Sequence, residues 1–381
     1  MIKELKISFL GDICPINRVE QAILTDDFSS FSDIKEILDS KDLVIANLEC
    51  PLIESGEKIS KIGPNLKGNP KTINLLHYLN IDVVALANNH ILDYGVTGLD
   101  KTVQLLKKEG IEYVGAGLNR NDMVKPLLKT INGVNICLIN VCEKEFNVTD
   151  DEEAGAHLFD IISVLRDIKQ YRPVSDLIVL FYHGGVETYN MPTPEMYKNF
   201  RYLAEEGVDL IVCDHQHTYS GYEQHAKSHI FYGLGNFIFD IPSIRNKSWN
   251  YGVILNFAFQ DKDHKSFELI PYEQCNGDPG LTINQKVKDN VLKEIDNINL
   301  KLTEILVNKE WEKFAIKENK NVLSNLLIQN RYFRYLLKKS NLIRLFITRN
   351  HEMRIYGYFI CQSHSELMRK SLRKKSKIQR A

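Results

Sequence analysis

Residues 83–95 have the sequence VVALANNHILDYG, which joins a short apolar run to a cluster of polar residues. The apolar run, residues 83–87, favours a strand that is buried on both faces. An amphipathic segment at residues 97–109 follows and stops at Gly110, as helices commonly do. This stretch therefore predicts a strand, a polar loop and a helix in succession.

The same alternation extends over most of the chain before residue 260. Further apolar runs predict strands at Lys6–Leu10, Leu43–Ala46, Ile136–Val141, Leu177–Tyr182, Leu210–Cys213, Ile230–Tyr232 and Val253–Phe259. Amphipathic segments at Pro70–Leu79 and Pro194–Glu206 predict helices that begin at a proline. Strands and helices in alternation indicate a layered α/β fold.

The composition changes after Pro279-Gly280. Apolar residues then recur at helical spacing, first from Val287 to Ile305 and again within residues 322–337. A short strand at residues 355–361 is the one exception that the pattern suggests. We therefore expect two domains, an α/β body at residues 1–280 and a basic, mostly helical region at residues 281–381.

Charge separates the same two parts of the chain. The 381 residues have a net charge of -1, but residues 282–381 contain 22 Lys/Arg and 9 Asp/Glu, against 26 and 40 in the remainder. Residues 369–380 include seven basic residues and no acidic one. Contact with an anionic membrane surface, contact with another polyanion and a solvated terminus all stay open for this region. No specific nucleic-acid partner is predicted, and a homo-oligomer stays open.

Ordinary composition excludes several protein classes. Apolar residues make up 44% and charged residues 25%, which argues against disorder over the whole length. No run of about 18 uncharged apolar residues predicts a membrane-spanning helix. The first residues lack the pattern of a secretion signal, and seven cysteines at irregular spacing favour reduced thiols. We expect a cytoplasmic protein, with peripheral contact at the inner membrane face as an open possibility.

Polar residues gather where the predicted strands end. In α/β sheets, functional residues lie just beyond the carboxyl ends of strands. The ends in question are Gly11-Asp12, Asn47-Leu48-Glu49, Asn88-Asn89-His90, His183-Gly184-Gly185-Val186-Glu187 and Asp214-His215-Gln216-His217. A single such residue is more often structural than functional. Five strand ends of this kind in one chain predict a site.

The residue types indicate a metal cluster. Imidazole and carboxylate ligands together suit Mn, Zn, Fe or Ni. Two divalent cations need a bridging carboxylate, several imidazoles and further oxygen ligands. The alternation His215-x-His217 would place both rings on one side of an extended segment. The predicted ligands are Asp12, Glu49, Asn89, His183, His215 and His217.

Catalytic roles are predicted around this cluster. His90 follows Asn89 directly, so its side chain should point elsewhere and could protonate a leaving group. Asp93 would support His90 or the loop, or alternatively cap the following turn. Glu187 would bind an amine or position His183, or alternatively remain a solvated acid.

The order of these motifs resembles the CapA-type poly-γ-glutamate capsule-synthesis proteins, which are similar in turn to calcineurin-like metallophosphoesterases. The resemblance spans about residues 5–260, and its most specific stretches are Leu86–Gly95 and Tyr232–Asp240. It implies a metallophosphatase-like four-layer sandwich, in which two central mixed sheets are flanked by helices and strand-end loops form a two-metal site. By position, the six predicted ligands match the metal-site motifs and His90 matches the catalytic histidine.

Three departures from the family pattern affect the interpretation. Cys14 stands where metallophosphoesterases have the histidine of Asp-x-His, and its thiolate is an alternative ligand for a soft metal. The usual His-Trp-Gly-x-Glu-Tyr motif lacks both aromatic residues at positions 184 and 188. Asp214 is added before His215 and could orient a ligand histidine, while Asn236 would hold loops together.

Two functions follow from the sequence. The first is a metal-dependent hydrolase of capsule or cell-envelope polymer metabolism, acting on a phosphoester, amide or ester of poly-γ-glutamate or polysaccharide through two metals and a bridging hydroxide. Its expected partner is an anionic polymer or phosphorylated substrate. The second is a non-catalytic scaffold or polymer-binding accessory protein. The sequence contains neither a Gly-x-Ser-x-Gly elbow nor a Walker phosphate loop, which argues against those two chemistries.

Overall fold

The computed structural model describes residues 4–61, 63–149, 153–244, 248–328 and 330–339. The chain divides into two compact units between Glu304 and Ile305. The predicted domain limits at residues 280 and 281 rest on composition and stay a prediction. The seven basic residues of 369–380 and the suggested strand at 355–361 lie outside the described residues.

The first unit contains an eight-stranded mixed sheet. In spatial order its path is β16 (Leu281–Thr282), β15 (Lys265–Gln274), β14 (Tyr251–Phe259), β1 (Leu5–Cys14), β2 (Leu43–Leu48), β3 (Val83–Ala85) and β4 (Glu112–Val114), with β13 (Asn236–Phe239) also paired to β1. The strands β1 to β4 and β13 run parallel, whereas β14, β15 and β16 pair with their neighbours in antiparallel fashion. Parallel strands in the centre bring several carboxyl ends to one edge.

A second, six-stranded mixed sheet lies beside the first. Its order is β11 (Tyr222–His225), β12 (Ser228–Phe231), β10 (Leu210–Asp214), β9 (Leu177–His183), β7 (Val134–Cys142) and β6 (Leu127–Ile131). The four central strands are parallel to one another, and each edge strand is antiparallel to its neighbour. A separate pair, β5 (Ala116–Gly117) and β8 (Gly155–Ala156), links two loops.

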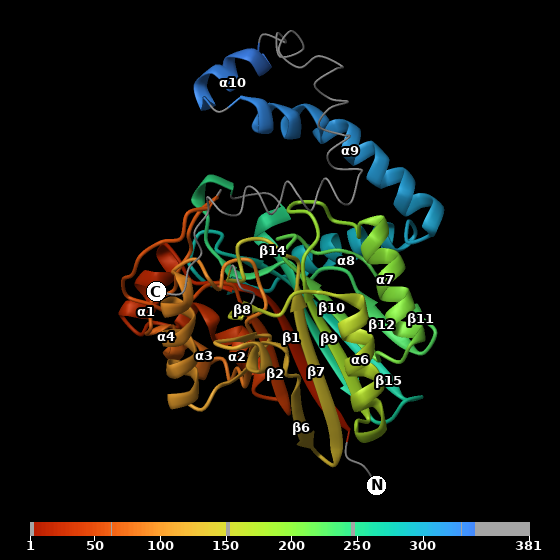
Figure 1. The fold of residues 1–381 in the computed structure, drawn as a ribbon. Helices are drawn as coiled ribbons and strands as arrows, with labels where there is room; N and C mark the ends of the chain where they lie inside the picture. Colours follow the sequence, from red (N-terminus) through yellow and green to blue (C-terminus); the bar gives the residue numbers. More distant parts are fainter. Residues whose placement is uncertain (1–3, 62, 150–152, 245–247, 329, 340–381) are drawn as a thin grey trace. The chain divides into compact units, whose positions relative to one another are not determined.

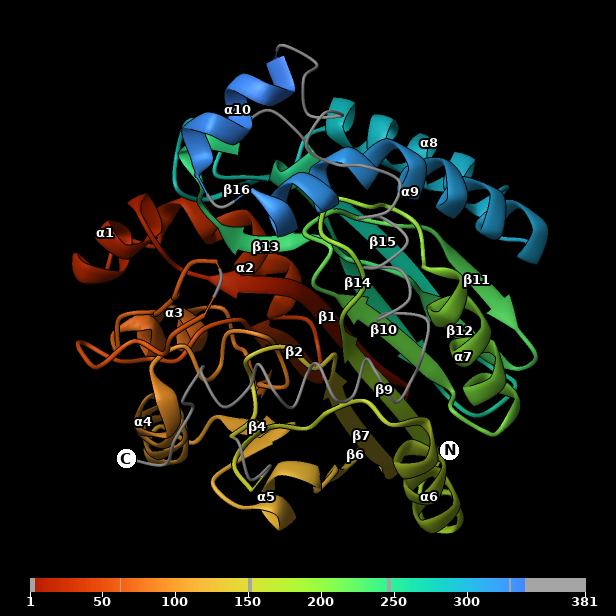
Figure 2. The ribbon, with the colours of Figure 1, turned by 45° about the horizontal axis from the view of Figure 1, so that its top comes forward.

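The two sheets pack face to face (Figures 1 and 2). Ile7, Ile45 and Val83 of the first sheet share a buried cluster with Val179 and Val212 of the second. These strands are buried on both faces, as their continuous apolar runs predict. The inter-sheet core therefore holds the two sets of strand ends in a fixed relation.

Helices cover the outer faces of both sheets (Figure 1). The first sheet carries α1 (Arg18–Leu24), α2 (Ser32–Leu38), α3 (Thr72–Tyr78) and α4 (Gly95–Lys108). The second carries α6 (Ile161–Tyr171) and α7 (Pro194–Glu205), while α8 (Gln285–Asn299) packs on β15 and β11 and α5 (Arg120–Val124) lies by β5. Short 3-10 turns occur at Ser29–Phe31, Arg172–Val174, Pro242–Ile244 and Ser248–Asn250. The predicted fold class, a four-layer α/β sandwich, is confirmed.

All eight predicted strands and all three predicted helices of the body are present. Helix α7 begins at Pro194 because the Thr193 side chain accepts a hydrogen bond from Met196 N and caps the first turn. Strand β15 escaped prediction, since one of its faces is partly exposed and its pattern mixes charged with apolar residues. Strand β13 was also not predicted, because it follows a glycine-rich turn and has only four residues.

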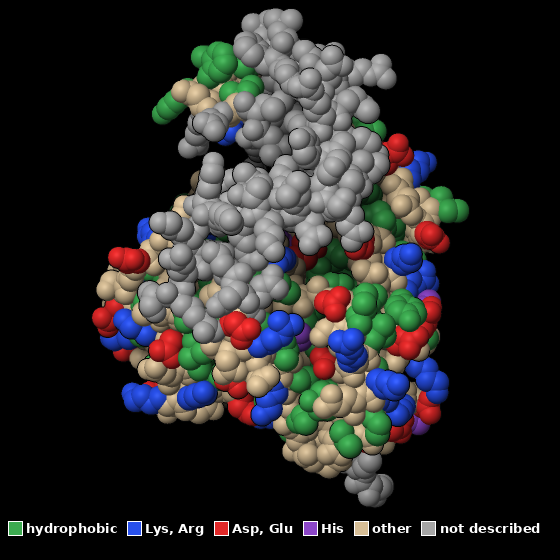
Figure 3. Space-filling model, in the orientation of Figure 1, with side chains coloured by type: hydrophobic (Ala, Val, Ile, Leu, Met, Phe, Trp, Pro, Cys, Tyr) green, Lys and Arg blue, Asp and Glu red, His purple; other side chains and the backbone are tan. Residues whose placement is uncertain are grey.

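The second unit, as far as the structure describes it, contains α9 (Glu304–Leu327) and α10 (Arg331–Lys339). The mostly helical character predicted for the C-terminal region is confirmed over these residues. Among the described helices, none is long and apolar enough to cross a membrane. Figure 3 shows acidic and basic side chains interspersed over one face of the described body, rather than gathered by sign.

Candidate metal centre

Strand pairing brings the predicted residues to one edge of the sandwich. The β1–β2 register sets Asp12 opposite Asn47, and the β1–β13 register sets Asp12 opposite Asn236. In the other sheet, the β9–β10 register sets His183 opposite Asp214. Because both sheets end here, side chains from distant parts of the sequence meet in one cluster.

Glu49 lies at the centre of this cluster. It belongs to two groups of side chains that could each hold a metal ion, one with His183 and His215 and one with Asp12 and His217. Its side chain is fully buried, and neither carboxylate oxygen has a hydrogen-bond partner among the described residues. Burial and the neighbouring charge of Asp12 raise the pKa of Glu49 well above its usual value. A buried carboxylate shared by two groups fits a pair of divalent cations, which would offset the cost of its burial.

The first group surrounds Nε2 of His183. This atom lies 3.5 Å from Oε1 of Glu49, 3.2 Å from Nδ1 of His215 and 3.1 Å from Oδ1 of Asn89. Ligand atoms that bind one cation at about 2.0–2.2 Å lie roughly 3.0–3.6 Å apart in tetrahedral or octahedral geometry. The observed spacing matches that range.

The second group pairs carboxylates with His217. Nδ1 of His217 lies 3.2 Å from Oδ2 of Asp12, and its Nε2 lies 3.9 Å from Oε1 of Glu49. Nδ2 of Asn47 donates to Oδ1 of Asp12 at 2.8 Å and lies 3.1 Å from Nδ1 of His183. Asn47 thus links one member of each group.

The charge states of the histidines differ between the two groups. Burial lowers the pKa of His183 to about 4, and burial together with His183 and His217 lowers the pKa of His215 well below its usual value. Burial also acts to lower the pKa of His217, but Glu49 and Asp12 outweigh it and raise this pKa to about 9. Burial acts to raise the pKa of Asp12, yet the His217 hydrogen bond and the charge of His183 hold it below its usual value. The neutral imidazoles of His183 and His215 beside carboxylates are the donor set that divalent transition metals prefer, whereas His217 would have to lose a proton before it could bind a cation.

His90 lies beside the cluster, and both Asp93 and Lys61 contact Nδ1 of its ring. Its Nδ1 lies 2.6 Å from Oδ2 of Asp93 and 3.1 Å from Nζ of Lys61, which also forms an ion pair with Asp93. Its Nε2 lies 4.0 Å from Oε1 of Glu49. Burial lowers the pKa of His90 and the Asp93 contact opposes this. Asp93 also accepts from Leu66 N at 2.6 Å, so it supports both His90 and the loop.

The remaining predicted residues occupy different positions. Glu187 is exposed on the loop after β9, close enough for its charge to act on Glu49 and His217. Asn236 donates to Trp249 O at 3.1 Å, and its Oδ1 lies 2.9 Å from Nδ1 of His217, so it ties a loop and orients a ring. Asp214 is buried with both oxygens unpaired among the described residues, so it makes no hydrogen bond to a ligand histidine.

The segment that carries the two histidines after β10 differs from the extended geometry that the alternation predicts. His215 has φ 94° and His217 has φ 54°, so both lie in the left-handed region. Such backbone is costly for residues other than glycine and persists where surrounding contacts enforce it. The Trp249 ring supplies one such contact, at 4.4 Å between centroids from the His217 ring. A turn, rather than strand alternation, directs both rings to the cluster.

Cys14 takes no part in either group. Its thiol is buried in the apolar core beside Cys50, and burial together with that neighbour raises its pKa well above the usual value. The alternative of a thiolate ligand therefore has no support in the geometry. None of the six cysteines that the structure describes forms a disulfide.

The sequence analysis assigned no role to three residues that contact the cluster. Asn47 and Lys61 are described above, and the third is Glu145, whose Oε2 accepts from Asn89 Nδ2 at 3.5 Å and whose Oε1 lies 3.8 Å from His215 Nε2. The strand-end rule would have found Glu145, because it follows the predicted strand at 136–141. Lys61 lies in an irregular loop, where no local signal indicates its contacts.

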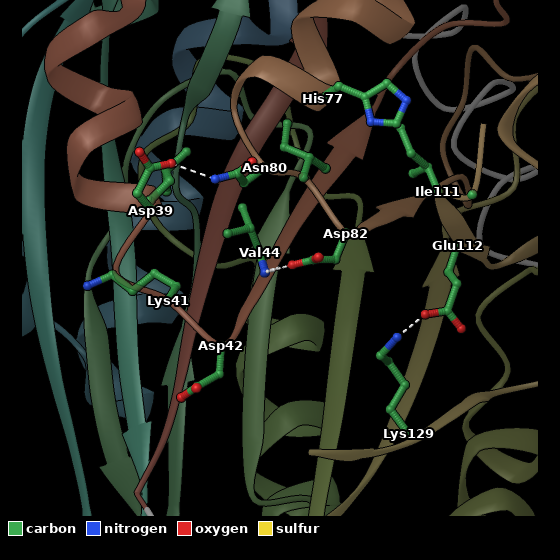
Figure 4. A pocket seen from close by; sticks show the side chains of 13 residues that line it. Asp39, Lys41, Asp42, Val44, His77, Asn80, Asp82, Ile111, Glu112 and Lys129 are labelled. Carbon is green, nitrogen blue, oxygen red and sulfur yellow. Dashed lines mark hydrogen bonds and ion pairs between the residues drawn. The ribbon is translucent and has the colours of Figure 1, made fainter. Parts of the chain in front are cut away.

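A polar cavity of about 470 Å³ lies at the opposite edge of the first sheet, where β2, β3 and β4 begin (Figure 4). Its charged groups are largely paired with the protein itself. Asp82 accepts from Val44 N at 2.8 Å, Lys129 forms an ion pair with Glu112, and Asn80 donates to Asp39. This cavity lacks the unpaired buried carboxylate that distinguishes the cluster around Glu49.

The amino-acid sequence of the chain matches a known protein family. The model of the family described as bacterial capsule synthesis protein PGA_cap matches residues 6–241. The chain is 26% identical over 336 residues to the capsule biosynthesis protein CapA of Bacillus anthracis, covering 85% of this chain and 80% of that protein. It is 27% identical over 298 residues to the PGA biosynthesis protein CapA of Bacillus subtilis, covering 76% of each.

Solved structures include a putative 5′-nucleotidase from Staphylococcus aureus, with a TM-score of 0.46 and 13% identity over 77% of this chain and 58% of that one. A similarity of this size carries no conclusion about activity. The layered fold rests on the strand pairing described above.

Proposed function

This chain belongs to the bacterial capsule synthesis protein (PGA_cap) family, and from that membership we propose that it is a metal-dependent hydrolase of capsule or cell-envelope polymer metabolism. The bond cleaved would be a phosphoester, amide or ester. One observation carries the proposal: the buried carboxylate of Glu49, which accepts no hydrogen bond from the described residues, is shared by two groups of potential ligands. A buried carboxylate with a purely structural role would lower the stability of the fold here, because no hydrogen bond offsets the loss of its hydration.

The cluster residues would hold two divalent cations. Glu49, His183, His215 and Asn89 would hold one, and Asp12, Glu49 and His217 the other, with Glu49 between them. Bound divalent cations of this kind lower the pKa of water and polarise the bond under attack. Asn47 and Asn236 would keep Asp12 and His217 oriented.

His90 would supply a proton to the leaving group from its doubly protonated form, which the contact with Asp93 favours. Its Nδ1 faces Asp93 at 2.6 Å, so that carboxylate fixes the ring and leaves Nε2 directed toward Glu49 and the substrate side. Lys61 balances the charge of Asp93. A positioned general acid of this kind contributes about 10²–10⁴-fold to a rate.

A non-catalytic scaffold remains the second candidate. It is favoured by the loop after β9, which lacks the two aromatic residues of the family motif and leaves Glu187 exposed. A chain of this kind would keep the fold and bind a polymer or a synthase without turnover.

One experiment separates the two functions. Protein purified without chelators is analysed for Mn, Zn, Fe and Ni by plasma mass spectrometry and assayed on phosphoesters and γ-glutamyl peptides. We expect two cations per chain and hydrolysis of one substrate class. Full metal occupancy without hydrolysis would favour the scaffold, and absence of metal would reject the metal centre.

Matched histidine variants control this measurement. His215→Ala removes a proposed ligand and should lower the metal content of the purified protein. His264→Ala removes an exposed ring that pairs with Asp261 and should leave the metal content unchanged. Equal metal content in both variants would remove His215 from the ligand set.

A further inference from the structure

Glu145 lies where β7 leaves the sheet, three residues after Cys142. Its side chain is 39% exposed, so one part faces solvent and the other faces the metal centre. Its two oxygens approach two different members of the first ligand group, Asn89 and His215.

The contact with Asn89 decides which end of the amide faces the cluster. Nδ2 of Asn89 donates to Oε2 of Glu145 at 3.5 Å, while Oδ1 lies 3.1 Å from Nε2 of His183. Only the oxygen of an amide can bind a cation, because its nitrogen is a donor. A carboxylate that attracts the nitrogen therefore holds the oxygen toward the ligand atoms.

The contact with His215 also holds a potential ligand atom toward the cluster. Nδ1 of His215 lies 3.2 Å from Nε2 of His183, and the opposite ring nitrogen lies 3.8 Å from Oε1 of Glu145. Metal-binding histidines generally direct their second nitrogen to a carboxylate or carbonyl, which fixes the ring and its tautomer. Glu145 is the carboxylate on that side of His215.

The loop that carries Glu145 is tied to the Asn89 turn. Asn147 is fully buried; its Oδ1 accepts from Glu145 N at 3.0 Å, and its Nδ2 donates to Glu143 O at 2.9 Å and Asn88 O at 3.3 Å. The backbone next to Asn89 and the backbone of Glu145 are thus held together through one side chain.

We propose that Glu145 is a positioning residue that orients Asn89 and His215 and so sets the cation affinity of the position formed by Glu49, His183 and His215. The proposal rests on the metal centre of the proposed function. It assigns no role to Glu145 at the position formed by Asp12, Glu49 and His217.

Titration of metal-free protein with Mn²⁺, followed by calorimetry and by the electron spin resonance of free Mn²⁺, tests this inference. Glu145→Ala should weaken one of two Mn²⁺ sites by about 10–100-fold and leave the other within a few-fold of wild type. Glu145→Gln keeps an oxygen for Asn89 Nδ2 but offers His215 less, so it should weaken the same site by a smaller factor. Thermal melting of the metal-free variants verifies that each is folded.

Glu57→Ala is the matched control, because it removes one acidic charge from an exposed position outside the cluster. Its Mn²⁺ affinities should stay within a few-fold of wild type. Two unchanged sites in Glu145→Ala, or equal losses in Glu145→Ala and Glu57→Ala, would overturn the positioning role while leaving the metal centre intact. A wild type that binds no divalent cation would overturn the metal centre, and this inference with it.

Discussion

At the scale of single residues, this protein keeps several ionisable groups where burial opposes their charge. Glu49 and Asp214 have raised pKa values because they are buried near other carboxylates, and His183 has a lowered one. Charge in such surroundings is stable only beside an opposite charge. The burial of Glu49 and His183 therefore lowers the stability of the metal-free body, and bound cations would offset that loss.

Lys61 provides a test of this view away from the cations. Its side chain is 3% exposed and pairs with Asp93, which is fully buried. Lys61→Met should lower the free energy of unfolding by about 3–5 kcal/mol, because it leaves Asp93 without its cation. Lys58→Met, an exposed position in the same loop, should change it by less than about 0.5 kcal/mol. Chemical denaturation measures both, and a small loss in Lys61→Met would mean that His90 alone balances Asp93.

The burial of His157 predicts that acid lowers the stability of the folded protein. It is buried, and burial lowers its pKa from 6.5 to about 4. The folded protein keeps this ring neutral while the unfolded chain protonates it, so stability is full above pH 6.5 and falls toward pH 4. The shift corresponds to a loss of about 3 kcal/mol.

Urea denaturation of metal-free wild type and His157→Asn between pH 4 and pH 7 measures this response. The difference in unfolding free energy between the two proteins should shrink by about 2–3 kcal/mol as the pH falls. A difference that is constant across this range would show that His157 does not contribute to acid sensitivity.

At the scale of elements, a close backbone contact between β1 and the turn before β13 fixes the position of Asp12 in the cluster. A Cβ at Gly11 would lie 1.7 Å from the carbonyl oxygen of Gly235, and Asp12 N donates to that same oxygen at 3.3 Å. Gly235 itself has φ +79°, a conformation that favours glycine. Two glycines thus let the backbone bring Asp12 beside Asn236.

Gly11→Ala should therefore disturb the site as well as the fold. We expect a loss of about 1–3 kcal/mol in unfolding free energy, since the backbone must move to accept the methyl group. Asp12 moves with it, so the affinity for divalent cations should fall in the same variant. Unaltered cation binding in a destabilised Gly11→Ala protein would indicate that Asp12 does not depend on this contact.

At the scale of the whole molecule, opposite charges are divided between two parts of the chain. Residues 1–281 carry 40 acidic and 26 basic residues, yet Figure 3 shows both signs interspersed on the visible face of the body. Two divalent cations would offset part of this excess at the cluster. The basic excess lies in residues 282–381, which extend beyond the residues that the structure describes.

Removal of residues 369–381 tests whether the basic terminus binds a polyanionic surface. Each basic residue near an anionic bilayer contributes about 1 kcal/mol, so deletion of seven should strongly reduce sedimentation with phosphatidylserine vesicles at low salt. Neutral phosphatidylcholine vesicles serve as the control. Equal sedimentation of both proteins with anionic vesicles would reject the membrane interpretation.

Local sequence patterns were enough to predict the layered fold and the set of strand ends that carry polar residues. Apolar runs and helical spacing are local properties, and parallel strands place their carboxyl ends at one edge in any such fold. Residues as distant as Asp12 and His217 could therefore be predicted to meet.

Which side chains touch, and in which direction they point, depends on the packing of the whole fold. The left-handed turns at His215 and His217, the ion pair of Lys61 with Asp93 and the approach of Glu145 to Asn89 all depend on packing between segments far apart in the chain. The same holds for Cys14, which its motif position offers as a ligand but which the core encloses beside Cys50. Side-chain direction at a loop is set by the surroundings that enclose it, and no local pattern in the sequence encodes those surroundings.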